Sequence, residues 1–137
     1  MSAGPSCVLD ASALLAFIRD EPGADAVEQA LNAGAVISAI NWAEVLTKTA
    51  EVGQDPDLLA DQLQRDGLLG DALQVIALDA ADGPDIARLR LTTRQHGLSL
   101  ADRACLTLAQ RLALPALTAD RAWAGLDLTV TVQLVRP

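Results

Sequence analysis

Short, continuously apolar runs alternate along this chain with longer segments of helical pattern. The apolar runs lie at residues 7–9, 35–37, 74–76 and 116–118, and a fifth lies at residues 130–135. Runs without polar alternation are typical of strands buried on both faces, and intervening helices favour parallel pairing. We therefore predict an α/β fold in which helices cover both faces of a mostly parallel sheet of four to five strands.

Start and stop signals place the helices between these runs. We expect one helix directly after residue 10 and others at residues 24–31, 42–52, 56–69, 80–93 and 99–112. The chain of 137 residues is long enough for one sizeable core. We therefore expect a single domain over residues 1–137, with a short N-terminal tail at about residues 1–5.

The charge of the chain is strongly acidic. Asp and Glu total 18 and Lys and Arg total 10, which gives a formal net charge of −8 at pH 7. Such a surface does not favour non-specific binding to nucleic acid by counterion release. It still allows a nuclease whose acids sit in a metal site, and it suits a basic protein partner.

Cysteine content and hydropathy indicate the compartment. Cys7 and Cys105 are the only cysteines, each within an apolar segment, so they do not suggest a disulfide framework. The sequence has no apolar run of 18 residues, and residues 1–5 lack the pattern of a signal peptide. We expect a soluble, cytoplasmic protein without a membrane segment.

Four carboxylates, each at the end of a predicted strand or near the start of a predicted helix, are the main functional candidates. They are Asp10, Glu44, Asp102 and Asp120. Ligands of parallel α/β sheets bind outside the carboxyl ends of the strands, so one rim of the sheet could hold all four. Clustered carboxylate oxygens are the ligands that Mg²⁺ and Mn²⁺ prefer.

Helix capping explains each of these acids when it is taken alone. Asp is a preferred N-cap, and both Asn41-x-x-Glu44 and Ser99-x-x-Asp102 match a capping box. Glu44 also lies four residues before Lys48, as in an ordinary surface ion pair. The pattern therefore leaves capping and metal ligation open.

Asp102 departs from the pattern of a simple cap. On its predicted helix it lies above Leu106, Ala109 and Ala113 on an apolar stripe. An inward-facing carboxylate is costly unless it is paired or binds a metal. The sequence also has a single histidine, His96, no tyrosine, no nucleophile elbow and no phosphate-binding glycine loop. Among the kinds of catalysis considered, the sequence therefore leaves catalysis by carboxylates that bind a hard cation.

The segments around the four acids resemble the PIN-domain nucleases. They read VLDAS, WAEVL, LADRACLTLA and LTAD, and contain Asp10, Glu44, Asp102 and Asp120 in that order. The resemblance covers residues 6–136 and is strongest to the ribonuclease toxins of VapBC-type toxin–antitoxin pairs. It implies a PIN-like three-layer α/β/α fold.

The resemblance also implies an activity and a set of partners. The four acids would hold one or two Mg²⁺ or Mn²⁺ ions, and Ser12 and Thr118 would support them through hydroxyl hydrogen bonds. The substrate would be RNA, cleaved internally by metal-activated water, and the protein would be a homodimer silenced by a cognate antitoxin. Lys48, Arg103 and Arg121 are candidate contacts to RNA phosphates, although ordinary surface charges or ion pairs explain them more simply.

Two alternatives to a nuclease toxin remain open at this point. One is a PIN-like module that binds protein or RNA without cleaving it. The other is a Mg²⁺-dependent α/β phosphatase or receiver domain, which also carries aspartates at strand ends. The phosphatase pattern calls for a second Asp where Ser12 stands, and the receiver pattern calls for a late Lys, whereas Lys48 is the sole Lys and comes early.

Overall fold

The computed structural model describes residues 4–137, so part of the expected tail at residues 1–5 lies outside the described residues. The strands are β1 (Cys7–Leu9), β2 (Ala35–Ser38), β3 (Leu73–Ile76), β4 (Ala116–Thr118) and β5 (Val132–Leu134). The α-helices are α1 (Ala11–Ile18), α2 (Ala24–Asn32), α3 (Ala39–Glu51), α4 (Pro56–Arg65), α5 (Gly83–Thr92) and α6 (Leu100–Leu112). Short 3₁₀ helices are η1 (Ala80–Asp82), η2 (Arg94–His96) and η3 (Arg121–Trp123).

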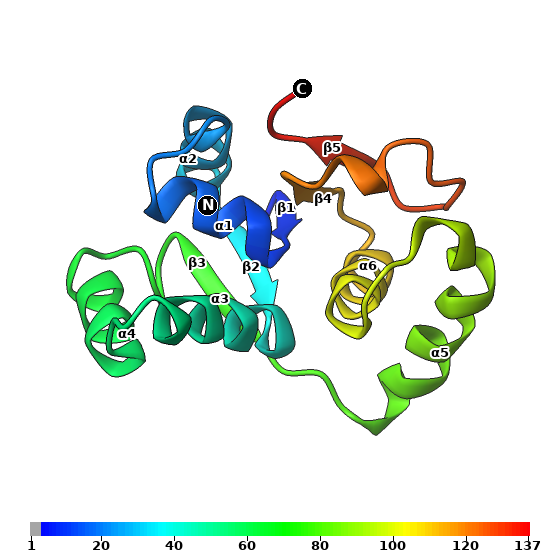
Figure 1. Cartoon of the computed structure of the whole chain (residues 1–137), viewed down its shortest axis with the longest axis horizontal. Helices are drawn as coiled ribbons and strands as arrows, with labels where there is room; N and C mark the ends of the chain where they lie inside the picture. Colours follow the sequence, from blue (N-terminus) through cyan, green and yellow to red (C-terminus); the bar gives the residue numbers. More distant parts are fainter. Residues whose placement is uncertain (1–3) are drawn as a thin grey trace.

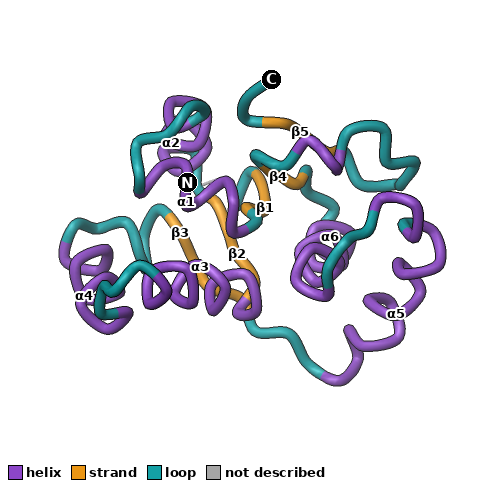
Figure 2. Tube along the Cα trace, in the orientation of Figure 1, coloured by secondary structure: helices purple, strands orange, loops and turns teal. Residues whose placement is uncertain are grey.

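The five strands form one sheet in the order β3-β2-β1-β4-β5, and every neighbouring pair is parallel. The strands run through the middle of the molecule, with α5 and α6 on the side away from α1 and α2 (Figure 1). Figure 2 shows the same sheet enclosed by helices and loops. The predicted three-layer α/β/α fold is confirmed.

The chain direction across the sheet reverses between β1 and β4. From β1 the chain moves outward through β2 to β3, and it returns to the other side of β1 to form β4 and β5. Such a switch point opens a crevice at the carboxyl ends of the two central strands. The residues that follow β1 and β4 are therefore brought side by side.

Two separate apolar cores cover the two faces of the sheet. The first contains Leu9 and Ile37 from the sheet, packed against α1, α2 and α3. The second contains Val8 and Val36, packed against α6 and the buried Trp123. Consecutive residues of one strand enter opposite cores because strand side chains alternate between the faces. This explains why the central strand β1 is apolar throughout.

Helix α3 begins earlier than the predicted residue 42. Ser38 is its N-cap, and the Ser38 hydroxyl accepts a hydrogen bond from the Asn41 backbone N–H at 3.0 Å. The predicted capping box from Asn41 to Glu44 is therefore wrong, and Glu44 lies in the second turn of α3 rather than in the first. The error arose because Ser38 and Asn41 are both good N-cap residues.

The other differences in helix bounds also have local causes. Helix α4 ends at Arg65 rather than near residue 69, because Gly67 takes a left-handed φ of 78°. The predicted helix at 80–93 is divided into η1 and α5, since Asp79 and Asp82 close a capping box around η1. Among residues 4–137, no helix combines the length and apolarity needed to cross a membrane.

Candidate functional site

Asp10 lies at the carboxyl end of β1 and is 3% exposed. It is the N-cap of α1, because its Oδ1 accepts a hydrogen bond from the Ala13 backbone N–H at 2.8 Å. Burial raises the pKa of Asp10 to about 6, although hydrogen bonds from Thr118, Ala13 and Ser12 act in the opposite direction. The fold therefore holds a carboxylate whose ionised form is costly at this position.

Two hydroxyl groups hold this carboxylate across the switch point. Thr118, the last residue of β4, donates to Asp10 Oδ2 at 2.5 Å, and Ser12 donates to Asp10 Oδ1 at 2.8 Å. The Ser12 hydroxyl also accepts the Ala119 backbone N–H at 2.9 Å. Both hydroxyls thus contact Asp10, as expected from the sequence, and together they link the ends of β1 and β4.

The charges of Glu44 and Asp102 reach the same region. Desolvation raises the pKa of Glu44, and the charge of Asp102 raises it further, while Lys48 lowers it. The charge of Asp102 also raises the pKa of Asp10. Burial raises the pKa of the Cys105 thiol, which also responds to all three carboxylates. These three acids therefore lie near the same rim of the sheet, and Asp102 is close enough for its charge to act on both of the others.

Asp102 combines capping with this convergence. Its Oδ2 accepts the Ser99 backbone N–H at 2.9 Å, and the Ser99 hydroxyl accepts the Asp102 N–H at 3.1 Å, so the predicted capping box at the start of α6 is present. Leu106 and Ala109, one and two turns later, are fully buried. The inward direction inferred for Asp102 agrees with its effect on Asp10 and Glu44.

Asp120 follows β4 and caps a short 3₁₀ helix. It is exposed, and its Oδ1 accepts the Ala122 N–H at 2.9 Å as the N-cap of η3. Its backbone N–H donates to the Thr118 hydroxyl at 3.0 Å, so its main chain adjoins the Asp10 contacts. Its charge is not among those that shift the pKa of Asp10 or Glu44.

The donor set suits a hard divalent cation. The converging groups are carboxylates flanked by hydroxyls, and mutual repulsion among carboxylates is what a cation relieves. No group of three or more His, Cys, Asp or Glu side chains within residues 4–137 is arranged to hold a metal ion as the chain stands. The residue types present fit a divalent cation, but their side chains as placed do not form a ligand set.

The three candidate phosphate contacts differ in their surroundings. Arg103 donates to the Ile86 carbonyl oxygen at 2.9 Å and so joins α6 to α5. Lys48 forms an exposed ion pair with Glu51 at 3.8 Å, and its charge also acts on Glu44. Arg121 is exposed next to Asp120. Arg103 thus has a structural role that its sequence position did not reveal.

Sequence reasoning missed two buried polar residues beside the acids, Ser38 and Asn41. Both are fully buried, and the Asn41 amide reaches the Ala101 carbonyl oxygen at the start of α6. The only local signal was that both are N-cap residue types. A contact between residues 60 positions apart leaves no sequence pattern.

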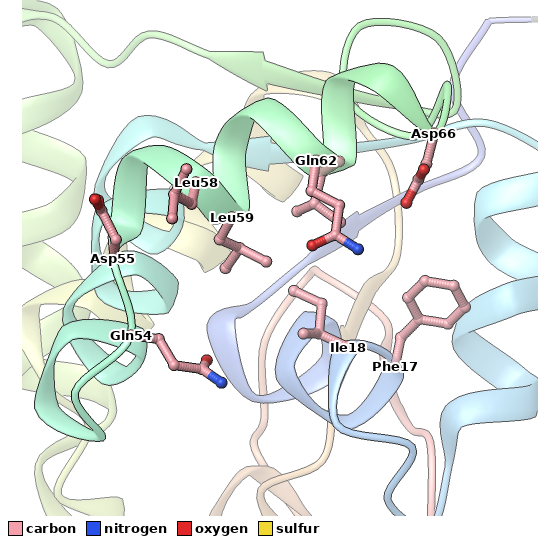
Figure 3. A pocket seen from close by; sticks show the side chains of 9 residues that line it. Phe17, Ile18, Gln54, Asp55, Leu58, Leu59, Gln62 and Asp66 are labelled. Carbon is pink, nitrogen blue, oxygen red and sulfur yellow. The ribbon is translucent and has the colours of Figure 1, made fainter.

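A pocket lies between α1 and α4 (Figure 3). Phe17 and Ile18 of α1 line one wall, and Leu58 and Leu59 of α4 line the other. None of the four candidate acids lines it. The lining combines these apolar side chains with four polar ones, Gln54, Asp55, Gln62 and Asp66.

Comparison with known proteins identifies the class of the fold and site. The PIN domain family matches residues 7–127, and the chain belongs to this family. No curated protein sequence shows a significant match to the chain. The sheet order also differs from the 2-1-3-4-5 order of receiver domains, which separates the chain from that alternative.

Solved structures with this fold come from several bacteria. A toxin–antitoxin complex from Klebsiella pneumoniae matches with 22% identity and a TM-score of 0.68, over 95% of this chain and 98% of that chain. VapBC-1 from nontypeable Haemophilus influenzae matches with 19% identity and a TM-score of 0.68, over 94% and 97%. VapC20 from Mycobacterium tuberculosis, described as a sarcin-ricin loop cleaving toxin, matches with 12% identity and a TM-score of 0.68, over 88% and 96%. At these identities the similarity establishes a shared fold.

Proposed function

We propose that this chain is a Mg²⁺- or Mn²⁺-dependent endoribonuclease that acts as the toxin of a toxin–antitoxin pair. The observation that carries the proposal is the convergence of Asp10, Glu44 and Asp102 at the switch point of a PIN fold. Several similar structures are of toxin–antitoxin complexes, which supports the same biology.

In this proposal Asp10, Glu44, Asp102 and Asp120 hold one or two cations. A cation bound there would activate water for attack on a phosphodiester and stabilise charge on the phosphate. Ser12 and Thr118 keep the Asp10 carboxylate in one orientation through their hydroxyl groups. The low exposure of Asp10 excludes water from most of its surface and strengthens its attraction to a cation.

The partners proposed for the chain follow from its charge and family. The substrate is RNA, which exposed cations such as Arg121 would contact through phosphates. A cognate antitoxin with a basic segment would neutralise the acidic rim, in agreement with the net charge of −8. We further propose that the toxin is a homodimer that acts in the cytoplasm.

The direct test is RNA cleavage by the purified chain with Mg²⁺, Mn²⁺ or EDTA. Asp10→Asn and Asp102→Asn should each abolish metal-dependent cleavage while circular dichroism shows that the fold is retained. Asp79→Asn is a matched control, because Asp79 also follows a strand and caps a helix, its Oδ1 accepting the Ala81 N–H at 2.8 Å. The control variant should cleave at the wild-type rate.

The outcomes separate the nuclease from its alternatives. Wild-type cleavage by Asp102→Asn would show that this acid is only a cap. RNA binding without cleavage under any metal condition would favour the non-catalytic PIN-like module. In cells, expression of the active chain should arrest growth unless a neighbouring antitoxin gene is co-expressed, and harmless expression of an active nuclease would rule out the toxin role.

A further inference from the structure

A buried chain of hydrogen bonds joins the end of β2 to the first turn of α6. The Ser38 hydroxyl donates to Asn41 Oδ1, and Asn41 Nδ2 donates to the Ala101 carbonyl oxygen at 3.0 Å. Ser38 and Asn41 are both fully buried. A buried amide is costly unless both of its ends are hydrogen-bonded, so Asn41 is held in one orientation.

The Asn41 amide contacts the peptide group that carries Asp102. The Ala101 carbonyl accepts from Asn41, and the N–H of the same peptide unit, that of Asp102, donates to the Ser99 hydroxyl at 3.1 Å. Because a peptide unit is planar and rigid, holding both of its polar atoms fixes the direction in which the Asp102 side chain leaves the helix. Asn41 thus acts on Asp102 through the main chain.

The buried apolar side chains of α3 and α6 belong to different cores. Val45 of α3 belongs to the first core, whereas Cys105 and Leu106 of α6 belong to the second core on the opposite face of the sheet. Glu44 and Asp102 also carry like charges, which repel each other. A direct polar link between the two helices resists that repulsion.

We propose that Asn41 is a positioning residue that fixes the main chain at Glu44 relative to the main chain at Asp102, so that the two side chains can bind one divalent cation. The inference rests on the proposed function, since it presumes that these two acids are ligands. Glu44 lies on α3 one turn after Asn41, and Asp102 directly follows the carbonyl that Asn41 binds. One amide therefore connects the two helices that carry these acids.

The test is calorimetric titration of the metal-stripped full chain with Mn²⁺ at pH 7.5. Asn41→Ala removes the hydrogen bond to α6, and Asn41→Leu removes it while filling more of the space that the Asn41 side chain occupies. Each variant should bind Mn²⁺ roughly ten- to hundredfold more weakly. The Mn²⁺ concentration for half-maximal RNA cleavage should rise by the same factor, with the maximal rate largely retained. Thermal unfolding without metal confirms that each variant is folded.

Thr49→Val is the matched control for the loss of a buried polar contact. Thr49 lies on the same helix and is 3% exposed, and its hydroxyl donates to the Val45 carbonyl within α3 at 2.9 Å. The control should keep wild-type Mn²⁺ affinity. Wild-type affinity in both Asn41 variants, or an equal loss in Thr49→Val, would overturn the positioning role alone. Absence of Mn²⁺ binding by the wild type would overturn the proposed function as well.

Discussion

Asp10→Asn should make the metal-free protein more stable at neutral pH. The pKa of Asp10 is about 6 in the folded chain, against an ordinary value of 3.8. At about 1.4 kcal/mol for each pH unit between these values, ionised Asp10 costs the folded state roughly 3 kcal/mol. An Asn side chain removes the charge, and the Thr118 and Ser12 hydroxyls can rotate to accept from its amide group.

The expected gain is about 1–3 kcal/mol in the free energy of unfolding, since some hydrogen-bond quality is lost with the carboxylate. For a chain of this size that corresponds to an increase of roughly 4–12 °C in Tm. Thermal unfolding in EDTA at pH 7.5 measures it. Asp79→Asn is again the control, because Asp79 is an exposed N-cap and Asn caps equally well.

The difference in stability between the wild type and Asp10→Asn should depend on pH. Below about pH 4, Asp10 is protonated in both the folded and the unfolded chain, so its ionisation does not separate wild type from variant. Between about pH 4 and 6 the unfolded chain loses this proton more readily, and the wild type loses stability relative to Asp10→Asn. The gap should open over this range and stay constant above about pH 7. If the variant is no more stable than the wild type at pH 7.5, or if the gap narrows as pH rises, ionised Asp10 does not cost the folded state stability.

A divalent cation should reverse the order of stability. A ligand present at a hundred times its Kd stabilises the folded state by about 2.7 kcal/mol, which is close to the cost assigned to ionised Asp10. Millimolar Mn²⁺ should therefore raise the Tm of the wild type and leave that of Asp10→Asn nearly unchanged. Equal shifts in the two proteins would show that Mn²⁺ binds elsewhere.

Two further substitutions test neighbouring contacts. Thr118→Val removes a hydroxyl that donates to Asp10, so the pKa of Asp10 should rise further. Calorimetry at pH 7.5 should show that the Mn²⁺ affinity falls about tenfold. Unchanged affinity would show that the Thr118 hydroxyl does not support metal binding. Arg111→Met leaves the buried Asp82 carboxylate without its partner at 3.2 Å, so urea denaturation should show a loss of about 1–3 kcal/mol. Arg88→Met breaks the exposed ion pair with Asp85 and should lower the free energy of unfolding by less than about 1 kcal/mol. Equal losses in the two variants would show that burial does not strengthen the Arg111–Asp82 pair.

Burial on both faces made the sheet predictable from the sequence. Val8 and Leu9 enter different cores, so the run that contains them had to be apolar throughout. The fifth strand was predicted too long, at residues 130–135. It pairs only with β4, and the register from Ala116↔Val132 to Thr118↔Leu134 leaves room for three residues.

The carboxylates were predictable as candidates because parallel strand ends share one rim. The contacts that orient them were not predictable in the same way. The sequence indicates a surface cation at Arg103, but this side chain donates to the main-chain carbonyl of Ile86. Because every residue type has a main-chain carbonyl, the sequence carries no signal for such a contact. The contact of Asn41 with Ala101 was hidden for the same reason.

Capping and ligand orientation use the same hydrogen bonds in this fold. Asp10, Asp102 and Asp120 each accept a backbone N–H near the start of a helix, which fixes the carboxylate and offsets part of its charge. Glu44 lies in the second turn of α3 and caps nothing, so its position depends on where α3 itself lies. An acid without a cap needs its helix to be fixed by another contact, and the link from Asn41 to α6 supplies one.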